Sequence, residues 1–129
     1  MKKLLALLLT ASALCLGSLS ASAAESAPKS LIHVVTVAWK DGTTPEQIQT
    51  ALDGAQALPA SFKGITRVWT RTLKIQNPPG TTTERTHIIV MEFESEEALK
   101  KYADSDAQKK WYEAYLPIRQ ESRTHDITN

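Results

Sequence analysis

The stretch from Leu31 to Lys40 reads LIHVVTVAWK and decides the fold of this chain. Its alternate positions form two rows, and both rows are mostly apolar and rich in β-branched residues. This pattern predicts a strand, and apolar rows on both sides predict a sheet that is covered on both faces. His33 carries the one polar ring of its row, so we expect any chemistry of the protein to begin near this residue.

The chain begins with the features of a secretory signal peptide. Lys2 and Lys3 give a positive end, an apolar run follows at residues 4–19, and Ala21-Ser22-Ala23 is a small-x-small signal. Residues 1–23 are therefore predicted to be a signal peptide that is cleaved after Ala23, which makes the protein secreted or periplasmic. The apolar run is too short and too interrupted for a membrane span, so no membrane attachment is expected after cleavage.

The predicted cleavage changes the composition of the protein. It removes two of the 15 basic residues, none of the 14 acidic residues and the single cysteine, Cys15. Leu14 is larger than the small residue that a lipidation signal places before its cysteine, so lipidation of Cys15 is not expected. A nearly neutral chain gives no electrostatic argument for binding nucleic acid, and a chain without cysteine forms no disulfide.

The rest of the chain alternates between helix and strand patterns. A capping-box pattern starts a helix at Thr44, and Pro59 is predicted to end it. Two strands follow, at residues 65–75 and 85–94. A helix then begins at Ser95 and is interrupted by polar residues at 104–106, and a short last strand is expected at 123–127. The order β-α-β-β-α-β predicts an α+β, ferredoxin-like protomer with an antiparallel sheet.

A sheet of this kind carries its helices on one face and leaves the other face bare. Pairing the sheets of two copies would cover the bare face, and it would explain why Leu31 to Lys40 is apolar on both sides. The sequence therefore predicts a homodimer. Residues 24–30 are expected to be a flexible lead-in, and residues 31–127 a single domain.

Motifs of one known family follow one another along the chain in the family's order and spacing. They are Ile32-His33-Val34-Val35 leading to Trp39-Lys40-Asp41-Gly42-Thr43, then Ala57-Leu58-Pro59, Lys63-Gly64-Ile65, Thr86-His87-Ile88 with Phe93-Glu94-Ser95, and Leu99 with Tyr102. Over about residues 31–127 the chain resembles the stress-responsive dimeric α/β-barrel family, Dabb. The resemblance implies that two ferredoxin-like protomers pair their sheets into a barrel, and that each protomer has a small pocket between sheet and helices.

The same resemblance suggests site residues. In a plant polyketide cyclase of this family, a tyrosine and a histidine do the acid–base work of an aldol-type ring closure. The resemblance places that tyrosine at Tyr102 and two further histidines of the cyclase at His33 and His87. The catalytic histidine falls on Gln108, and glutamine cannot take up a proton near neutral pH. This departure argues against the cyclase mechanism.

Each candidate site residue has a functional and a structural interpretation. His33 and His87 are expected on neighbouring strands, either as a polar pair that moves protons in a pocket or as hydrogen-bonded core or interface residues. Tyr102 is expected as a proton donor or ligand anchor, or as a core residue with a solvated hydroxyl. The remaining pocket residues, some of which also fit a core, are predicted to be Val35, Val37, Ile89, Gln108 and Trp111.

The sequence contains none of the signals of several enzyme classes. It has no Gly-rich phosphate loop, no Ser/His/Asp order and no Cys/His cluster, which argues against nucleotide enzymes, common hydrolases and zinc proteins. Two histidines without a carboxylate in the pattern are a poor metal site. We therefore expect neither a metal nor a cofactor.

Three functions remain. The sequence favours a non-catalytic, stress-responsive protein of the cell envelope that binds a small apolar or aromatic molecule. The alternative is a cofactor-free cyclase or isomerase that acts on a carbonyl compound, such as a polyketide, with His33 or His87 as base and Tyr102 as proton donor. The third is a structural dimer whose filled core leaves no pocket.

Overall fold

The structure is a computed structural model that describes residues 30–74, 76 and 83–128. The predicted signal peptide and the lead-in up to residue 29 lie outside the described residues. The elements in chain order are β1 (Leu31–Trp39), α1 (Pro45–Gln56), α2 (Leu58–Ser61), β2 (Ile65–Thr72), β3 (His87–Phe93), α3 (Glu96–Tyr102), α4 (Asp106–Tyr115) and β4 (Arg119–Ile127).

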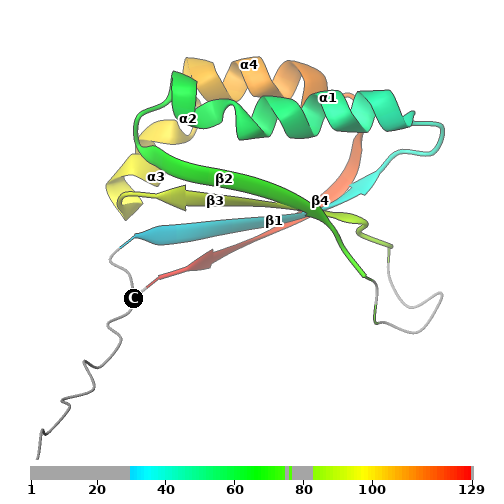
Figure 1. Ribbon diagram of the computed structural model, residues 1–129, viewed down its shortest axis with the longest axis horizontal. Coiled ribbons are helices and arrows are strands. Elements are labelled where there is room, and N and C mark those ends of the chain that lie inside the picture. The colour runs from blue at the N-terminus through cyan, green and yellow to red at the C-terminus, as the bar shows by residue number, and fades with distance from the viewer. Residues whose placement is uncertain (1–29, 75, 77–82, 129) are drawn as a thin grey trace, which may run out of the picture.

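The strands form one antiparallel sheet in the order β2-β3-β1-β4. Helices α1, α2 and α4 lie over one face of this sheet, and no described helix covers the other face (Figure 1). The predicted ferredoxin-like class is therefore confirmed. Strands β1 and β3 are central, whereas β2 and β4 are the two edges of the sheet.

Local sequence signals explain where the helices begin. The Thr44 hydroxyl accepts a hydrogen bond from the Gln47 backbone N–H, and the Gln47 side chain accepts one from the Thr44 backbone N–H, so the predicted capping box is present. The prediction for Pro59 is wrong, because α1 already ends at Gln56 and Pro59 lies in the first turn of α2. Proline is tolerated there because the first turn needs no intrahelical N–H bond.

Two strand boundaries also differ from the prediction. Strand β4 begins at Arg119, four residues before the expected start, and β2 ends at Thr72 rather than at residue 75. Most residues of β4 are exposed, so the strand needs no apolar row and its sequence shows little alternation of apolar and polar residues. Its backbone is held instead by pairing with β1 from Ile32 to Trp39.

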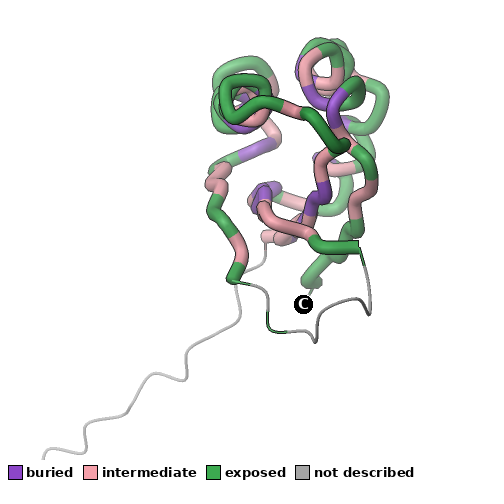
Figure 2. Tube along the Cα trace, turned by 90° about the vertical axis from the view of Figure 1, so that its right-hand side faces the viewer, coloured by how far each residue is buried: buried purple, intermediate pink, exposed green. Residues whose placement is uncertain are grey.

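The hydrophobic core lies between the sheet and the helices. Most of its strand residues share the helix-facing rows of β1 and β3, and they cluster with buried residues of all four helices. Figure 2 marks the buried residues in purple along the chain. The least exposed of the strand residues are Val37, Ile89 and Phe93, each with an exposed fraction of 0%. The other face of the sheet presents a second apolar row, formed mainly by Ile32, Val34, Trp69, Ile88 and Val90.

Candidate functional site

His33 forms a hydrogen bond with Asp126, a residue that no sequence pattern singled out. It lies on the helix-facing row of β1, directly opposite Asp126 of β4, and its Nδ1 is 2.6 Å from Asp126 Oδ1. Because a carboxylate only accepts hydrogen bonds, Nδ1 carries the shared proton and Nε2 is left as an acceptor in the neutral ring. The exposed fractions of the two side chains are 18% and 40%, so solvent reaches the pair.

His87 is held in the opposite tautomer. The Trp39 indole N–H donates to His87 Nδ1 over 2.9 Å, and an indole can only donate, so Nδ1 carries no proton. The neutral ring therefore carries its hydrogen on Nε2. Burial lowers the pKa of His87, which keeps the ring neutral near pH 7. As a result, His87 offers a hydrogen-bond donor, and its one basic nitrogen is already engaged.

The structure places the two histidines on the same face of paired strands without bringing them together. His33 lies opposite Met91, and His87 lies opposite Val37. Four residues along β1 separate these positions, a distance of roughly 13 Å at the usual rise of a strand. The two rings therefore do not form a polar pair, and each has its own partner.

Tyr102 is buried beside the His33 end of the sheet. Its exposed fraction is 2%, and its ring centre is 5.4 Å from that of Phe93 and 5.5 Å from that of Phe62. The His33 ring contacts the same Phe93 ring edge-on at 6.0 Å. Among the described residues the Tyr102 hydroxyl has no hydrogen-bond partner. Burial raises the pKa of Tyr102 above its usual value, so the hydroxyl keeps its proton.

The other predicted pocket residues occupy different environments. The Gln108 side chain accepts a hydrogen bond from the Asp104 backbone N–H at 2.8 Å, and its own backbone N–H donates to Ser105, so Gln108 closes the start of α4. Residues Val35, Val37 and Ile89 are in the core, with exposed fractions of 6%, 0% and 0%. Among these predicted pocket residues, Trp111 is the one that lines a hollow in the described part of the structure.

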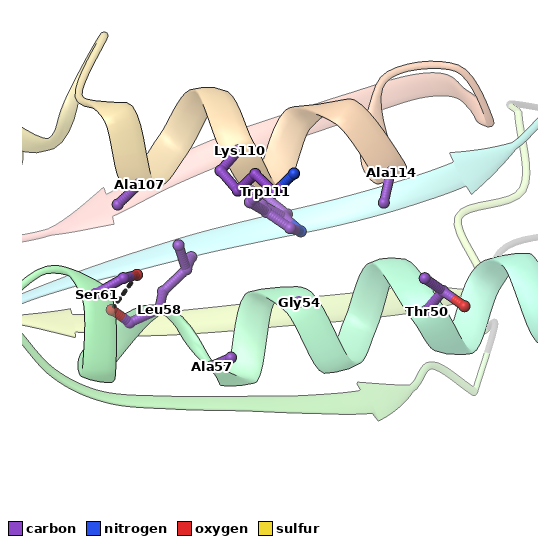
Figure 3. Close-up of a pocket in the computed structure, with 9 residues that line it drawn as sticks. All are labelled: Thr50, Gly54, Ala57, Leu58, Ser61, Ala107, Lys110, Trp111 and Ala114. Carbon is purple, nitrogen blue, oxygen red and sulfur yellow. Dashed lines mark hydrogen bonds between the residues drawn. The ribbon is translucent and has the colours of Figure 1, made fainter.

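That hollow is a groove between α1 and α4, with α2 closing one end (Figure 3). Its volume is about 350 Å³, and its lining is mostly apolar. The lining residues are Thr50, Gly54, Ala57, Leu58, Ser61, Ala107, Lys110, Trp111 and Ala114. We call this hollow the Trp111 groove. It exists because four of these positions carry no side chain larger than a methyl group.

Trp111 forms a fixed wall of the groove. Its indole N–H donates to the Ala51 carbonyl at 2.9 Å, and its ring stacks on Tyr115 with ring centres 4.6 Å apart. A Cβ added at Gly54 would lie 3.2 Å from the Trp111 ring, a tight contact that the ring would have to relieve by a small shift. From the sequence, Trp111 was predicted as a pocket residue, whereas Gly54 indicated only close packing of its helix and was not placed in the pocket.

Two features are absent from the described residues. No group of three or more His, Cys, Asp or Glu residues in this part of the chain is arranged to hold a metal ion. No helix within 30–74, 76 and 83–128 has the length and apolar character needed to cross a membrane.

Comparison with known proteins identifies the family. The model of the Stress responsive A/B Barrel Domain, Dabb, matches residues 31–129. The chain belongs to the Dabb family. None of the curated proteins matches this Dabb chain.

Solved structures support the fold of this Dabb chain. The Arabidopsis thaliana protein At3g17210 is 24% identical, with a TM-score of 0.67 over 77% of this chain and 94% of that one. A dimeric ferredoxin-like protein of unknown function from Thermobifida fusca is 15% identical, with a TM-score of 0.63 over 78% and 91%. The hydroxynitrile lyase of Passiflora edulis is 14% identical, with a TM-score of 0.65 over 78% and 94%. At these identities the likeness concerns the fold alone.

Proposed function

We propose that this Dabb protein is non-catalytic and binds a small apolar or aromatic molecule in the Trp111 groove. The observation that carries the proposal is an apolar groove of about 350 Å³ with a buried indole as its wall. Sites for small molecules are typically concave, mostly apolar, and roughly 300–1,000 Å³ in volume. The groove therefore fits a ligand at the small end of this range.

The polar groups around the groove favour an apolar ligand. Ser61 donates its hydroxyl hydrogen to the Leu58 carbonyl, Thr50 donates to the Glu46 carbonyl, and the Lys110 ammonium pairs with Glu113. Since these groups already have partners, a ligand gains most of its binding energy by covering apolar surface. That gain is roughly 25 cal/mol for each Å² removed from water.

The proposal includes the assembly and the location of the protein. We propose that two copies pair through the bare sheet face, supported by its apolar row and by similar solved structures that are described as dimeric. The pattern of residues 1–23 supports export to the cell envelope. A stress-related role is in keeping with the family.

Gly54→Leu is expected to abolish ligand binding, and a circular dichroism spectrum checks that the variant stays folded. The leucine side chain would crowd the Trp111 ring and narrow the groove, while leucine favours a helix by roughly 1 kcal/mol relative to glycine. The measurement is a thermal-shift screen with aromatic and β-dicarbonyl compounds. A ligand at about 100 times its Kd adds about 2.7 kcal/mol, which raises the Tm of a chain this size by several degrees.

Gln56→Leu is the matched control for this screen. It adds the same side chain to α1 at an exposed position that does not line the groove. The control should respond to ligands like the natural protein. Ligands that shift the Tm of Gly54→Leu as much as that of the natural protein would place their site elsewhere and contradict the proposal.

A second candidate function is a cofactor-free cyclase or isomerase that acts on a carbonyl compound. The His33–Asp126 pair favours it, because the carboxylate fixes the ring and leaves Nε2 as a base. In such a reaction His33 would take a proton from the carbon beside the carbonyl and return it elsewhere on the substrate. Tyr102, on the other side of Phe93, would donate a hydrogen bond to the carbonyl oxygen.

Asp126→Asn tests this second function. If His33 is a base, the amide will no longer hold the catalytic tautomer, and turnover should fall by about 10²-fold or more, the usual contribution of a general base. The measurement is the turnover of every carbonyl compound that binds, with the exposed turn variant Asp41→Asn as control. Binding without any turnover by the natural protein would contradict catalysis and leave the binding function.

A further inference from the structure

A second hollow lies at the opposite side of α1 from the Trp111 groove, against the edge strand β2. Its volume is about 270 Å³. The lining residues are Gln49, Leu52, Thr70, Arg71, Thr72 and His87. We call it the Arg71 hollow. It shares no lining residue with the Trp111 groove, so its role is independent of the proposed function.

Several hydrogen-bond donors line the Arg71 hollow. The Trp39 indole N–H donates to Nδ1 of His87, so the other ring nitrogen, Nε2, carries the hydrogen and is the donor that the ring can offer a ligand. The Thr70 hydroxyl accepts a hydrogen bond from the Gln56 side chain at 3.2 Å, which leaves its own hydrogen to donate. The hydroxyl of Thr72 adds a further donor, because β2 places Thr70 and Thr72 on the same face.

Arg71 supplies the charge of the hollow. One guanidinium nitrogen donates to the Thr70 carbonyl at 2.7 Å, which turns the group along the edge of the sheet. Within the described part of the chain Arg71 has no acidic partner, unlike Arg67 four positions earlier, which pairs with Glu92 at 2.9 Å. No carboxylate lines the hollow. The nearby Asp53 is engaged by the Gln49 amide at 2.7 Å.

We infer that the Arg71 hollow binds the carboxylate group of a small organic acid. Arg71 starts from the bare face of the sheet, and its guanidinium is held at the sheet edge, next to the neutral donors of the helix-facing side. A single guanidinium there matches one negative charge, and its planar fork matches the two oxygens of a carboxylate. A phosphate group carries about −1.5 to −2 charges near pH 7, more than one arginine neutralises. Leu52 provides an apolar contact for a short carbon chain beyond the carboxylate.

The burial of His87 supports this assignment. A histidine that gained a proton on binding would have to break the Trp39 hydrogen bond, and burial lowers the pKa of His87. The ring thus presents a neutral donor to the anion over the whole range near pH 7. Binding should therefore depend little on pH between about 6 and 8, where Arg71 keeps its charge.

The test is a titration of the purified protein with sodium butyrate, followed by ¹H–¹⁵N NMR at constant ionic strength. Saturable shifts are expected at the backbone amides of residues 70–72 and at the Arg71 side-chain N–H. Arg71→Gln should weaken binding by at least about tenfold, because it removes a charge-assisted hydrogen bond. The exposed position of Arg71 makes unfolding of this variant unexpected.

Arg67→Gln is the matched control, since it makes the same change on the same strand and the same sheet face, at a position that does not line the hollow. It should bind butyrate like the natural protein. Sodium phosphate in a parallel titration distinguishes the two kinds of anion, and tighter binding of phosphate than of butyrate would overturn the assignment. The absence of saturable shifts, or equal weakening in both arginine variants, would overturn it as well.

Discussion

Val34→Asp is expected to convert the protein from a dimer to a monomer. Val34 lies at the centre of the bare sheet face, on central strand β1 opposite Val90 of β3. A dimer formed through one face uses the same residues on both copies, so the substitution places two carboxylates in the interface. An unpaired charge buried there costs several kcal/mol, so the Kd of the dimer should rise by roughly three orders of magnitude. Light scattering at micromolar concentration measures the mass.

Ala60→Asp is the control for this change. It adds the same charge on the exposed surface of α2, on the helix side of the molecule, and should leave the mass of a dimer unchanged. A circular dichroism spectrum checks that both variants keep their secondary structure. A natural protein with the mass of a monomer, or a Val34→Asp variant with the mass of a dimer, would contradict the proposed interface.

Phe93→Ala is expected to cost about 3–5 kcal/mol of stability, the usual cost of removing a buried aromatic ring. Phe93 has an exposed fraction of 0%, and its ring lies between those of His33 and Tyr102. The loss corresponds to a fall in Tm of more than about 10 °C for a domain of this size. Urea or thermal unfolding followed by circular dichroism measures it.

Phe93→Leu separates the loss of volume from the loss of the ring. Leucine keeps most of the buried volume, so this variant should cost less than about 1.5 kcal/mol. The pair of variants tests whether the space between His33 and Tyr102 is a filled core. A loss below about 1 kcal/mol for Phe93→Ala would contradict that description and favour a ligand site at this end of the sheet.

The fold was predictable because its main signals are local. The two apolar rows of β1 and the capping residues at Thr44 and Ser95 identify strand and helix starts without tertiary information. The boundaries that were wrong depend on packing. β4 is held by pairing with β1 rather than by burial of its side chains, and a short extra helix accommodates Pro59.

The candidate site was less predictable because its partners meet through the register of the sheet. Asp126 is 93 residues away from His33 in sequence, and Trp39 is 48 residues away from His87. No local pattern encodes these pairs. The Trp111 groove was also hidden, because an absent side chain at Gly54 becomes a hollow only when a second helix packs beside it.

The measurement that tests the account most directly is a ¹H–¹⁵N spectrum of the indole N–H groups during titration with a ligand from the screen. The Trp111 indole donates to Ala51 at the groove, whereas Trp69 lies on the bare face of the sheet. If the ligand binds in the Trp111 groove, the Trp111 signal moves and saturates while the Trp69 signal stays in place. A ligand that saturates the protein and leaves the Trp111 signal unmoved would contradict binding in the groove.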